Sequence, residues 1–331
     1  MSMFRRILFA VRNPEAAQQP GLEKALSIAR AFGASLELFH AIAEPVYAQR
    51  LPVSDETIDR LRERIEERVR LRLARLTMVA RERGLTVENF VAWDYPPHEA
   101  VVRRAVASGA DLIIAECHRG ARTRAWLMHL TDWELLRTSP LPVLLLKSAR
   151  PYRHPLTLAA VDPGHLHAKP LDLDSHIVAS AREFSKVLRG SLHLMHASHP
   201  SVFALALGDP GINAAALSMT YEDLQVQERE TFEKFIAGIE VPRARTHLVN
   251  GDPVVAIPRV ARKLGAQLVV MGAVSRSGLK RVFIGNTAER VLETLPCDVL
   301  VVKAADFHTR VAREPKGIRV FAPPQPSSIL S

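Results

Sequence analysis

The second half of this 331-residue chain repeats the first half. Residues 245–303 align without a gap on residues 89–147, at a constant offset of 156 positions. Residues 158–161 match residues 8–11 at an offset of 150, which indicates a six-residue insertion in the second copy. A tandem duplication restricts the chain to two copies of one fold, and it makes each copy an internal control for the other.

The chain length fits two domains, each large enough to bury a core without disulfides. The two cysteines, Cys117 and Cys297, do not align with each other between the copies, so no disulfide framework is expected. The first residues lack the apolar run of a signal peptide, and no stretch approaches the length of a membrane span. These features predict a protein of the reducing cytoplasm.

The formal net charge of +9 raises the question of a polyanionic partner. Arginines and glutamates are interleaved, most densely in residues 60–68, and this pattern favours solvated helix faces with ion pairs. Zinc-finger spacing and aromatic RNA-binding signatures are both absent from the sequence, so no specific nucleic-acid partner is predicted.

Short apolar runs alternate with segments of helical spacing in both copies. In the first copy, strands are expected near residues 6–11, 35–41, 87–91, 110–115 and 143–146, and helices near 21–32, 54–84, 97–107 and 132–138. In the second, strands are expected near 158–161, 192–197, 245–249, 267–271 and 299–302, and helices near 175–188, 217–237, 254–264 and 287–295. Strands that alternate with helices predict an α/β fold with two tandem Rossmann-like, doubly wound parallel sheets.

Three regions follow from this pattern: a first domain at residues 1–150, a second at 151–306 and a basic, Pro/Ser-containing tail at 307–331. The tail is expected to be loose, with the alternative that residues 318–321 pair onto a sheet edge. The strands Val143–Leu146 and Val299–Val302 are apolar enough to need cover. We therefore expect the two domains to pack as an intramolecular pseudo-dimer, and a homodimer remains a further option.

Ligands of doubly wound sheets bind beyond the carboxyl ends of the strands. There, Met271-Gly272 is followed by the small-residue turn Ser275–Gly278, and Gly285-Asn286-Thr287 opens the next helix. Backbone amides of a tight turn and of a helix N-terminus can cradle phosphates, and Arg276 would add positive charge. The alternative is an ordinary helix cap beside a flexible turn.

Asp162 ends the first strand of the second copy, at the same sheet edge. A carboxylate there can accept hydrogen bonds from ribose hydroxyls or from an adenine amino group. Its alternative role is to cap the turn Asp162-Pro163-Gly164.

The first copy lacks these residues at the matching positions. Glu116 replaces Gly272, Arg119 replaces Ser275, His129 replaces Gly285, Leu130 replaces Asn286, and Arg12 replaces Asp162. Because the losses are concentrated at one strand edge, we expect only the second copy to bind phosphate. Arg12 and the arginines at positions 119, 122 and 124 leave open a different anion site in the first copy.

The pattern Gly272-x2-Ser275-x9-Gly285-Asn286 resembles the nucleotide-binding motif of the universal stress protein family, Gly-x2-Gly-x9-Gly followed by Ser or Thr. Ser275 stands where the motif has glycine, and Asn286 stands where it has a hydroxyl residue. Residues 285–290, 297–303 and 131–137 also resemble the tandem E-type bacterial members, and the resemblance extends over about residues 4–305.

The resemblance implies the universal stress protein, or adenine nucleotide alpha hydrolase-like, fold and a role in the stress response. It implies an adenine nucleotide such as ATP or AMP as the ligand. The implied contacts are Asp162 with Ala160 and Val161 to the nucleoside, Ala197 to the base, Met271 and Gly272 to the base and ribose, and Ser275, Gly285, Asn286 and Thr287 to phosphates.

Three alternatives stay open. The apolar segment Val202–Leu217 could form the wall of a pocket for a lipid-like molecule, and its alternative role is core packing. Weak ATP hydrolysis is another option, although no Ser-His-Asp arrangement or catalytic carboxylate pair can be assigned, so binding is favoured over catalysis. The last alternative is zinc, for which the histidines at the second-copy edge are His165, His167, His193, His196 and His199. Their spacing matches no standard pattern, and no metal is predicted.

Overall fold

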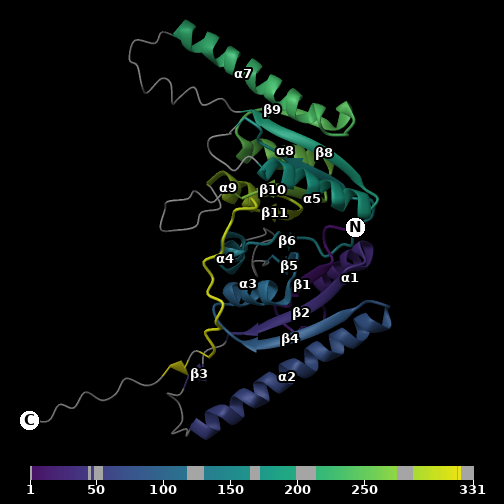
Figure 1. The fold of residues 1–331 in the computed structure, drawn as a ribbon, viewed down its shortest axis with the longest axis vertical. Helices are drawn as coiled ribbons and strands as arrows, with labels where there is room; N and C mark the ends of the chain where they lie inside the picture. The colour runs from purple at the N-terminus through teal and green to yellow at the C-terminus, as the bar shows by residue number, and fades with distance from the viewer. Residues whose placement is uncertain are drawn as a thin grey trace, which may run out of the picture.

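A computed structural model describes residues 2–43, 46–47, 55–117, 130–164, 172–198, 214–273, 286–318 and 320–321. Strands and helices alternate along the chain, and helices cover both faces of one continuous ten-stranded sheet (Figure 1). A separate sheet consists of two short strands. The predicted α/β class is therefore confirmed.

The predicted elements are present, with ends that shift by only a few residues. The first repeat contains β1 (Arg6–Ala10), α1 (Pro20–Phe32), β2 (Ser35–Ile42), β3 (Val46–Tyr47), α2 (Asp55–Glu82), β4 (Val87–Trp93), α3 (Pro97–Ser108), β5 (Leu112–Glu116), α4 (Leu130–Thr138) and β6 (Val143–Leu146). The second contains β7 (Leu156–Ala160), α5 (Leu173–Val187), β8 (Ser191–Ser198), α7 (Ala214–Ala237), a 3-10 turn (Arg243–Arg245), β9 (Thr246–Asn250), α8 (Pro253–Leu264), β10 (Leu268–Gly272), α9 (Asn286–Thr294) and β11 (Asp298–Val302). The last strand is β12 (Val320–Phe321).

Two glycines that align between the repeats end corresponding helices. Gly109 after α3 has φ of 68°, and Gly265 after α8 has φ of 66°. Side chains disfavour this left-handed conformation, and glycine reaches it freely. The same turn is therefore made by the same residue in both copies.

The order of strands is β4-β2-β1-β5-β6-β11-β10-β7-β8-β9. Every pairing within a repeat is parallel, and the two repeats join through the antiparallel pair β6 and β11, where Leu144 lies opposite Leu300. Both of these strands are buried along their whole length. The apolar edges thus cover each other, and the two repeats form the expected intramolecular pair.

Each face of the sheet carries a core to which both repeats contribute. The helices α1, α2, α5 and α7 pack on one face, whereas α3, α4, α8 and α9 pack on the other. The long helices α2 and α7 lie at opposite ends of the molecule (Figure 1). Of the helices that the structure describes, none has the length and apolar character needed to cross a bilayer.

The expectation of a loose tail is wrong for residues 307–318. Thr309 Oγ1 donates to the carbonyl of Thr138 at 2.7 Å, at the end of α4. Further along, Arg103 of α3 donates to the carbonyl of Ala312 at 2.6 Å, and the amide of Lys316 donates to a side-chain oxygen of Asp94 at 2.8 Å. Polar groups of the first repeat therefore bind residues 307–318, which Figure 1 shows as a yellow segment without helix or strand.

The alternative prediction, that part of the tail forms a β-strand, is confirmed, but the strand pairs elsewhere than at an edge of the main sheet. β12 pairs in parallel with β3, so Val320 lies opposite Val46 and Phe321 opposite Tyr47. The two strands form their own small sheet and do not extend an edge of the ten-stranded sheet.

Lys147 and Lys303 align between the repeats but have different surroundings. The ammonium group of Lys147 donates to the carbonyls of Leu292 and Leu295, at the end of α9. The ammonium nitrogen of Lys303 is buried and lies 4.6 Å from the ring centroid of Phe307, and it has no hydrogen-bond partner in the part of the chain that the structure describes. Burial lowers the pKa of Lys303 from its ordinary value near 10.5 to about 8.

Replacing Lys303 by methionine is expected to stabilise the protein at neutral pH. Since the folded-state pKa is depressed, the unfolded chain binds more protons between about pH 8 and 10.5, and wild-type stability rises with pH through this window. Below pH 8 the full cost of burying the charge is present, on the order of 3 kcal/mol. Urea unfolding at pH 7 and pH 10 measures the difference.

Lys147→Met is the matched control, and its expected effect has the opposite sign. Removing this ammonium group leaves two buried carbonyls unpaired, which costs about 1–3 kcal/mol. If both variants were more stable than the wild type, or if neither were, the predicted difference in the energetic roles of Lys303 and Lys147 would be wrong.

Candidate ligand site at the carboxyl edge of the second repeat

Three neighbouring strands of the second repeat end at the predicted site. Ala160 of β7 lies in register with Met271 of β10, and β8 pairs on the other side of β7 and ends just beyond Ala197. Val161 follows β7 and is held by a hydrogen bond from its amide to the carbonyl of Met195, at 2.9 Å. The structure therefore brings the predicted nucleoside contacts together at one edge.

The Asp162 carboxylate lies at this edge, and its side chain is 43% exposed. The Asp162 amide donates to a side-chain oxygen of Asp174 at 3.1 Å. Asp174 is buried in the first turn of α5, where the helix dipole favours a carboxylate. Asp174 thus holds the backbone at the start of the turn after β7, and the Asp162 side chain lies at the edge of the sheet.

A buried histidine supports the backbone beside Asp162. His196 Nδ1 donates to the carbonyl of Val161 at 3.1 Å and lies 3.7 Å from Asp162 Oδ1. The aligned histidine of the first repeat, His40, makes the same bond to the carbonyl of Val11 at 2.7 Å. Because both copies keep this bond, it serves the fold and ties the ends of two adjacent strands together.

Two residues of α7 complete the surroundings of His196, and sequence reasoning missed both. Glu228 Oε2 lies 3.9 Å from His196 Nε2, and the Phe232 ring lies 5.7 Å from the imidazole. Both atoms are buried, and among the described residues neither His196 Nε2 nor Glu228 Oε2 has a hydrogen-bond partner. The four-residue spacing of Glu228 and Phe232 on one helix face was the available signal.

Several predicted site residues lie outside the described residues, namely Ser275, Arg276 and Gly285. Asn286 and Thr287 are described in their backbone only, as the first two residues of α9. Of the apolar segment Val202–Leu217, only the part from residue 214 is described, as the start of α7. His165, His167 and His199 also lie outside the described residues.

Packing alone accounts for Gly272. A Cβ atom there would lie 2.7 Å from the Leu173 side chain, closer than atoms pack. In the first repeat the glycine lies on the helix and the larger side chain lies at the strand end. Glu116 ends β5 and accepts a hydrogen bond from the Gly21 amide of α1 at 2.8 Å. A Cβ atom on Gly21 would lie 2.2 Å from that carboxylate. The Glu116 carboxylate is therefore built into the first repeat, at the position where the second repeat has no side chain.

The two described histidines of the zinc alternative do not converge. His196 contacts Phe232 of α7, whereas His193 stacks on His247 with a ring-centroid distance of 5.3 Å. The two positions are three residues apart on β8 and so face opposite sides of the sheet. Within the described ranges, no group of three histidine, cysteine or acidic side chains has the geometry of a metal site.

Comparison with known proteins gives consistent results. The sequence model of the universal stress protein family matches residues 3–147 and 172–303. Universal stress protein E of Salmonella typhi is 26% identical over 94% of this chain and 98% of its own length. A functionally unknown protein from Pseudomonas aeruginosa PAO1 is 30% identical, with a TM-score of 0.70 over 92% of this chain and 94% of its own. A putative universal stress protein from P. aeruginosa UCBPP-PA14 is 29% identical over the same shares, with a TM-score of 0.71.

Proposed function

The chain belongs to the universal stress protein family, and we propose that it is a cytoplasmic stress-response binding protein whose second repeat holds an adenine nucleotide such as ATP or AMP. The observation that carries the proposal is the arrangement at the strand ends of that repeat. Ala160 and Met271 are in register there, and the Asp162 carboxylate is half-exposed beside them.

Each of these residues has a physical reason to contact a nucleoside. Small side chains at adjacent strand ends let a flat base approach the backbone, and a carboxylate accepts hydrogen bonds from ribose hydroxyls. α9 begins at Asn286, after the same strand β10, so its unpaired amides and positive dipole end favour phosphate. Ser275, Arg276, Gly285 and Thr287 are proposed to complete the phosphate contacts.

The first repeat is proposed to have a structural role or to contact a protein partner. Glu116 places a carboxylate at the corresponding strand end, and its bond to Gly21 holds that charge in place. A phosphate approaching this edge would meet a like charge.

Replacing Gly285 by aspartate is expected to weaken ATP binding by about 5- to 150-fold. A carboxylate at the start of α9 repels phosphate and occupies its space, at a cost on the order of 1–3 kcal/mol. Isothermal titration calorimetry of the wild type and the variant with ATP measures the change. One universal stress protein, from Archaeoglobus fulgidus, has been solved in complex with dAMP, which serves as a second probe.

His129→Asp is the matched control, since position 129 of the first repeat aligns with position 285. It introduces the same charge in the other repeat and is expected to leave affinity unchanged. Equal losses in both variants would refute the assignment to the second repeat. A wild type that binds neither nucleotide at millimolar concentration would refute the function itself.

A further inference from the structure

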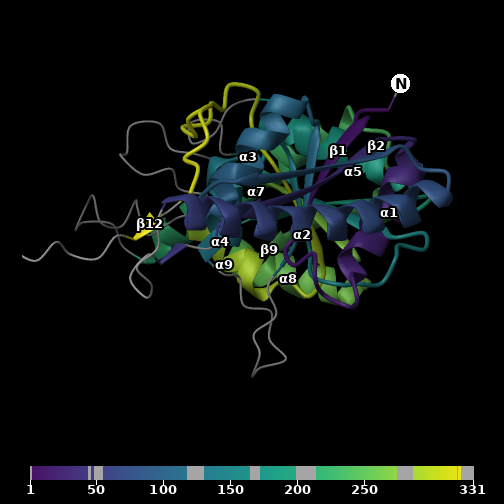
Figure 2. The same cartoon turned by 90° about the horizontal axis from the view of Figure 1, so that it is seen from below.

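The long helix α2 presents an outward face that combines arginines with apolar side chains. The residues of this α2 outer face share a three- and four-residue spacing and are Leu61, Arg64, Arg68, Leu71, Arg72, Arg75, Met78 and Val79. The opposite face of the helix contributes Val69 and Leu73 to the core. α2 lies at one end of the molecule and crosses the front of the view from below, so its outer face is open to solvent (Figures 1 and 2).

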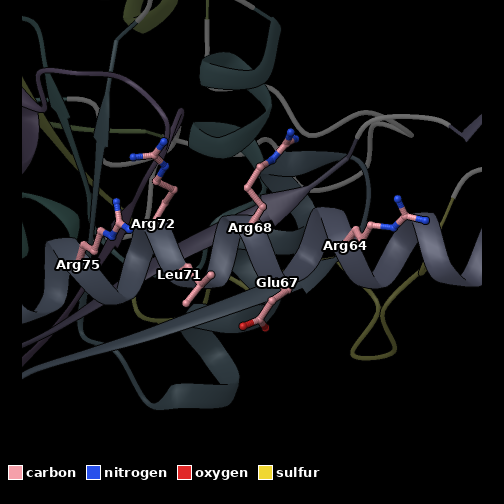
Figure 3. Close-up of a pocket in the computed structure, with 6 residues that line it drawn as sticks. All are labelled: Arg64, Glu67, Arg68, Leu71, Arg72 and Arg75. Atoms are coloured by element: carbon pink, nitrogen blue, oxygen red, sulfur yellow. The ribbon is translucent and has the colours of Figure 1, made fainter.

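The charge of this face is unbalanced. A groove of about 410 Å³ runs along it and is lined by four arginines, Leu71 and a single glutamate, Glu67 (Figure 3). Arg68 pairs with Glu15 at 2.9 Å, whereas Arg64, Arg72 and Arg75 form no ion pair with any carboxylate of the described residues.

This result corrects part of the expectation from the sequence. Ion pairs between neighbouring turns of α2 do form, from Arg60 to Glu56 and from Arg70 to Glu66. Arg64, Arg72 and Arg75 of the outer face have no such partner among the described residues. The helix is therefore not ion-paired along its whole length.

The same face exposes large apolar side chains. Leu61, Leu71, Met78 and Val79 are each between 45% and 59% exposed. On α7, the long helix at the other end of the molecule, Val226 is the one large apolar residue of the described part with comparable exposure. Among the described side chains of the two long helices, several exposed large apolar residues are thus found on α2 and one on α7.

We propose that the α2 outer face binds the surface of an anionic phospholipid bilayer. Guanidinium groups pair with lipid phosphates, and they do so most strongly when no protein carboxylate competes. The neighbouring Leu, Met and Val side chains enter the boundary between headgroups and acyl chains, which stabilises the bound state further. The protein would lie on the membrane surface through this face, and this role is independent of the nucleotide site.

A nucleic-acid partner fits this face less well. Its phosphates would satisfy the arginines but would leave the apolar side chains in water. Binding of single strands also depends on aromatic residues for stacking, and α2 contains none. The combination of unpaired arginines with exposed aliphatic side chains therefore favours a bilayer.

The test is sedimentation of the full-length protein with vesicles of phosphatidylglycerol and phosphatidylcholine, against phosphatidylcholine alone. The variant Arg64→Gln/Arg72→Gln/Arg75→Gln removes the three guanidinium groups. A basic residue near an anionic surface is worth about fivefold in affinity, so the triple variant is expected to bind on the order of 100-fold more weakly. Pure phosphatidylcholine vesicles are expected to bind neither protein.

Matched controls come from exposed residues elsewhere. Arg259→Gln/Arg262→Gln/Lys263→Gln on α8 removes the same charge, and Val226→Ser/Val255→Ser removes exposed apolar side chains. Both are expected to keep vesicle binding, whereas Leu71→Ser/Met78→Ser on α2 is expected to weaken it severalfold. Circular dichroism checks that each variant is folded.

Two results would overturn the proposal. The first is an equal loss in the α8 charge control, which would mean that diffuse net charge attracts the protein. The second is tight binding of duplex DNA at 150 mM salt that the α2 triple variant abolishes, together with no binding to anionic vesicles.

Discussion

Replacing Asp298 by alanine is expected to destabilise the whole chain by about 3–5 kcal/mol, the usual cost of removing one partner from a buried ion pair. Asp298 starts β11 in the second repeat and pairs with the ammonium group of Lys24, from α1 of the first repeat. The two side chains are 0% and 2% exposed. Without the carboxylate, a buried lysine charge would be left uncompensated.

Asp298 also holds the connection between the repeats. Its carboxylate accepts hydrogen bonds from the amides of Lys147 and Ser148, at 2.8 and 2.9 Å, and from the Tyr152 hydroxyl at 2.7 Å. These three donors lie in the segment that leaves β6 and leads to β7. One side chain therefore anchors the first repeat, the second repeat and the linker.

Urea unfolding measures this effect. Asp306→Ala removes an exposed aspartate and is expected to change stability by no more than about 0.5 kcal/mol. Combining Asp298→Asn with Lys24→Met removes both charges, so it should cost less than the sum of the two single changes. An Asp298→Ala variant as stable as Asp306→Ala would show that the buried pair does not hold the repeats together.

Most of the fold can be predicted from local signals in the sequence. Apolar runs and helical spacing locate the strands and helices, and glycines such as Gly109 and Gly265 mark where helices end. The pairing of β6 with β11 follows from two apolar strands that would otherwise be uncovered edges. These features depend on neighbouring residues or on a simple rule of burial, so no knowledge of distant contacts is needed.

The contacts that sequence reasoning missed are irregular and long-range. The tail contains several prolines and no periodic apolar pattern, so its sequence gives no sign of its hydrogen bonds to Asp94, Arg103 and Thr138. Asp298 aligns with Pro142 in the first copy, so the duplication gives no hint of its pairing with Lys24. Such contacts arise from the meeting of two different repeats, which neither copy contains by itself.

In the candidate site, too, the features set by local sequence are predictable, whereas the long-range contacts are not. The predicted parallel sheet places Met271 and Asp162 at one edge, because the ends of parallel strands meet there, and the family resemblance adds Ala160. Alignment of the copies identifies Glu116 as a departure from the second copy, but its hydrogen bond to Gly21 depends on where α1 begins. Glu228 belongs to a helix whose register over His196 is fixed by tertiary packing with Phe232.

Replacing Phe184 by alanine is expected to cost about 3–5 kcal/mol and to destabilise the first repeat as well as the second. Phe184 lies on α5 of the second repeat, and its ring contacts Phe4 and Phe32 of the first, with centroid distances of 5.5 and 4.9 Å. All three rings are buried, so the cavity left by the substitution would open between the repeats.

The three tryptophans of the chain, at positions 93, 126 and 133, all lie in the first repeat. Tryptophan fluorescence during urea unfolding therefore reports on that repeat, although Phe184 belongs to the other. We expect the fluorescence midpoint of Phe184→Ala to fall together with the midpoint from far-ultraviolet circular dichroism, because the shared core makes unfolding cooperative.

A double-mutant cycle separates direct contact from general weakening. Phe184→Ala and Phe32→Ala should be coupled by about 0.5–1.5 kcal/mol, the range measured for aromatic pairs. The control cycle uses Phe39→Ala, whose ring stacks on Phe90 within the first repeat, and its effect should add to that of Phe184→Ala. If the tryptophan transition stayed at its wild-type midpoint in Phe184→Ala, the repeats would be independent units joined only along β6 and β11. The shared aromatic cluster would then contribute packing without cooperativity.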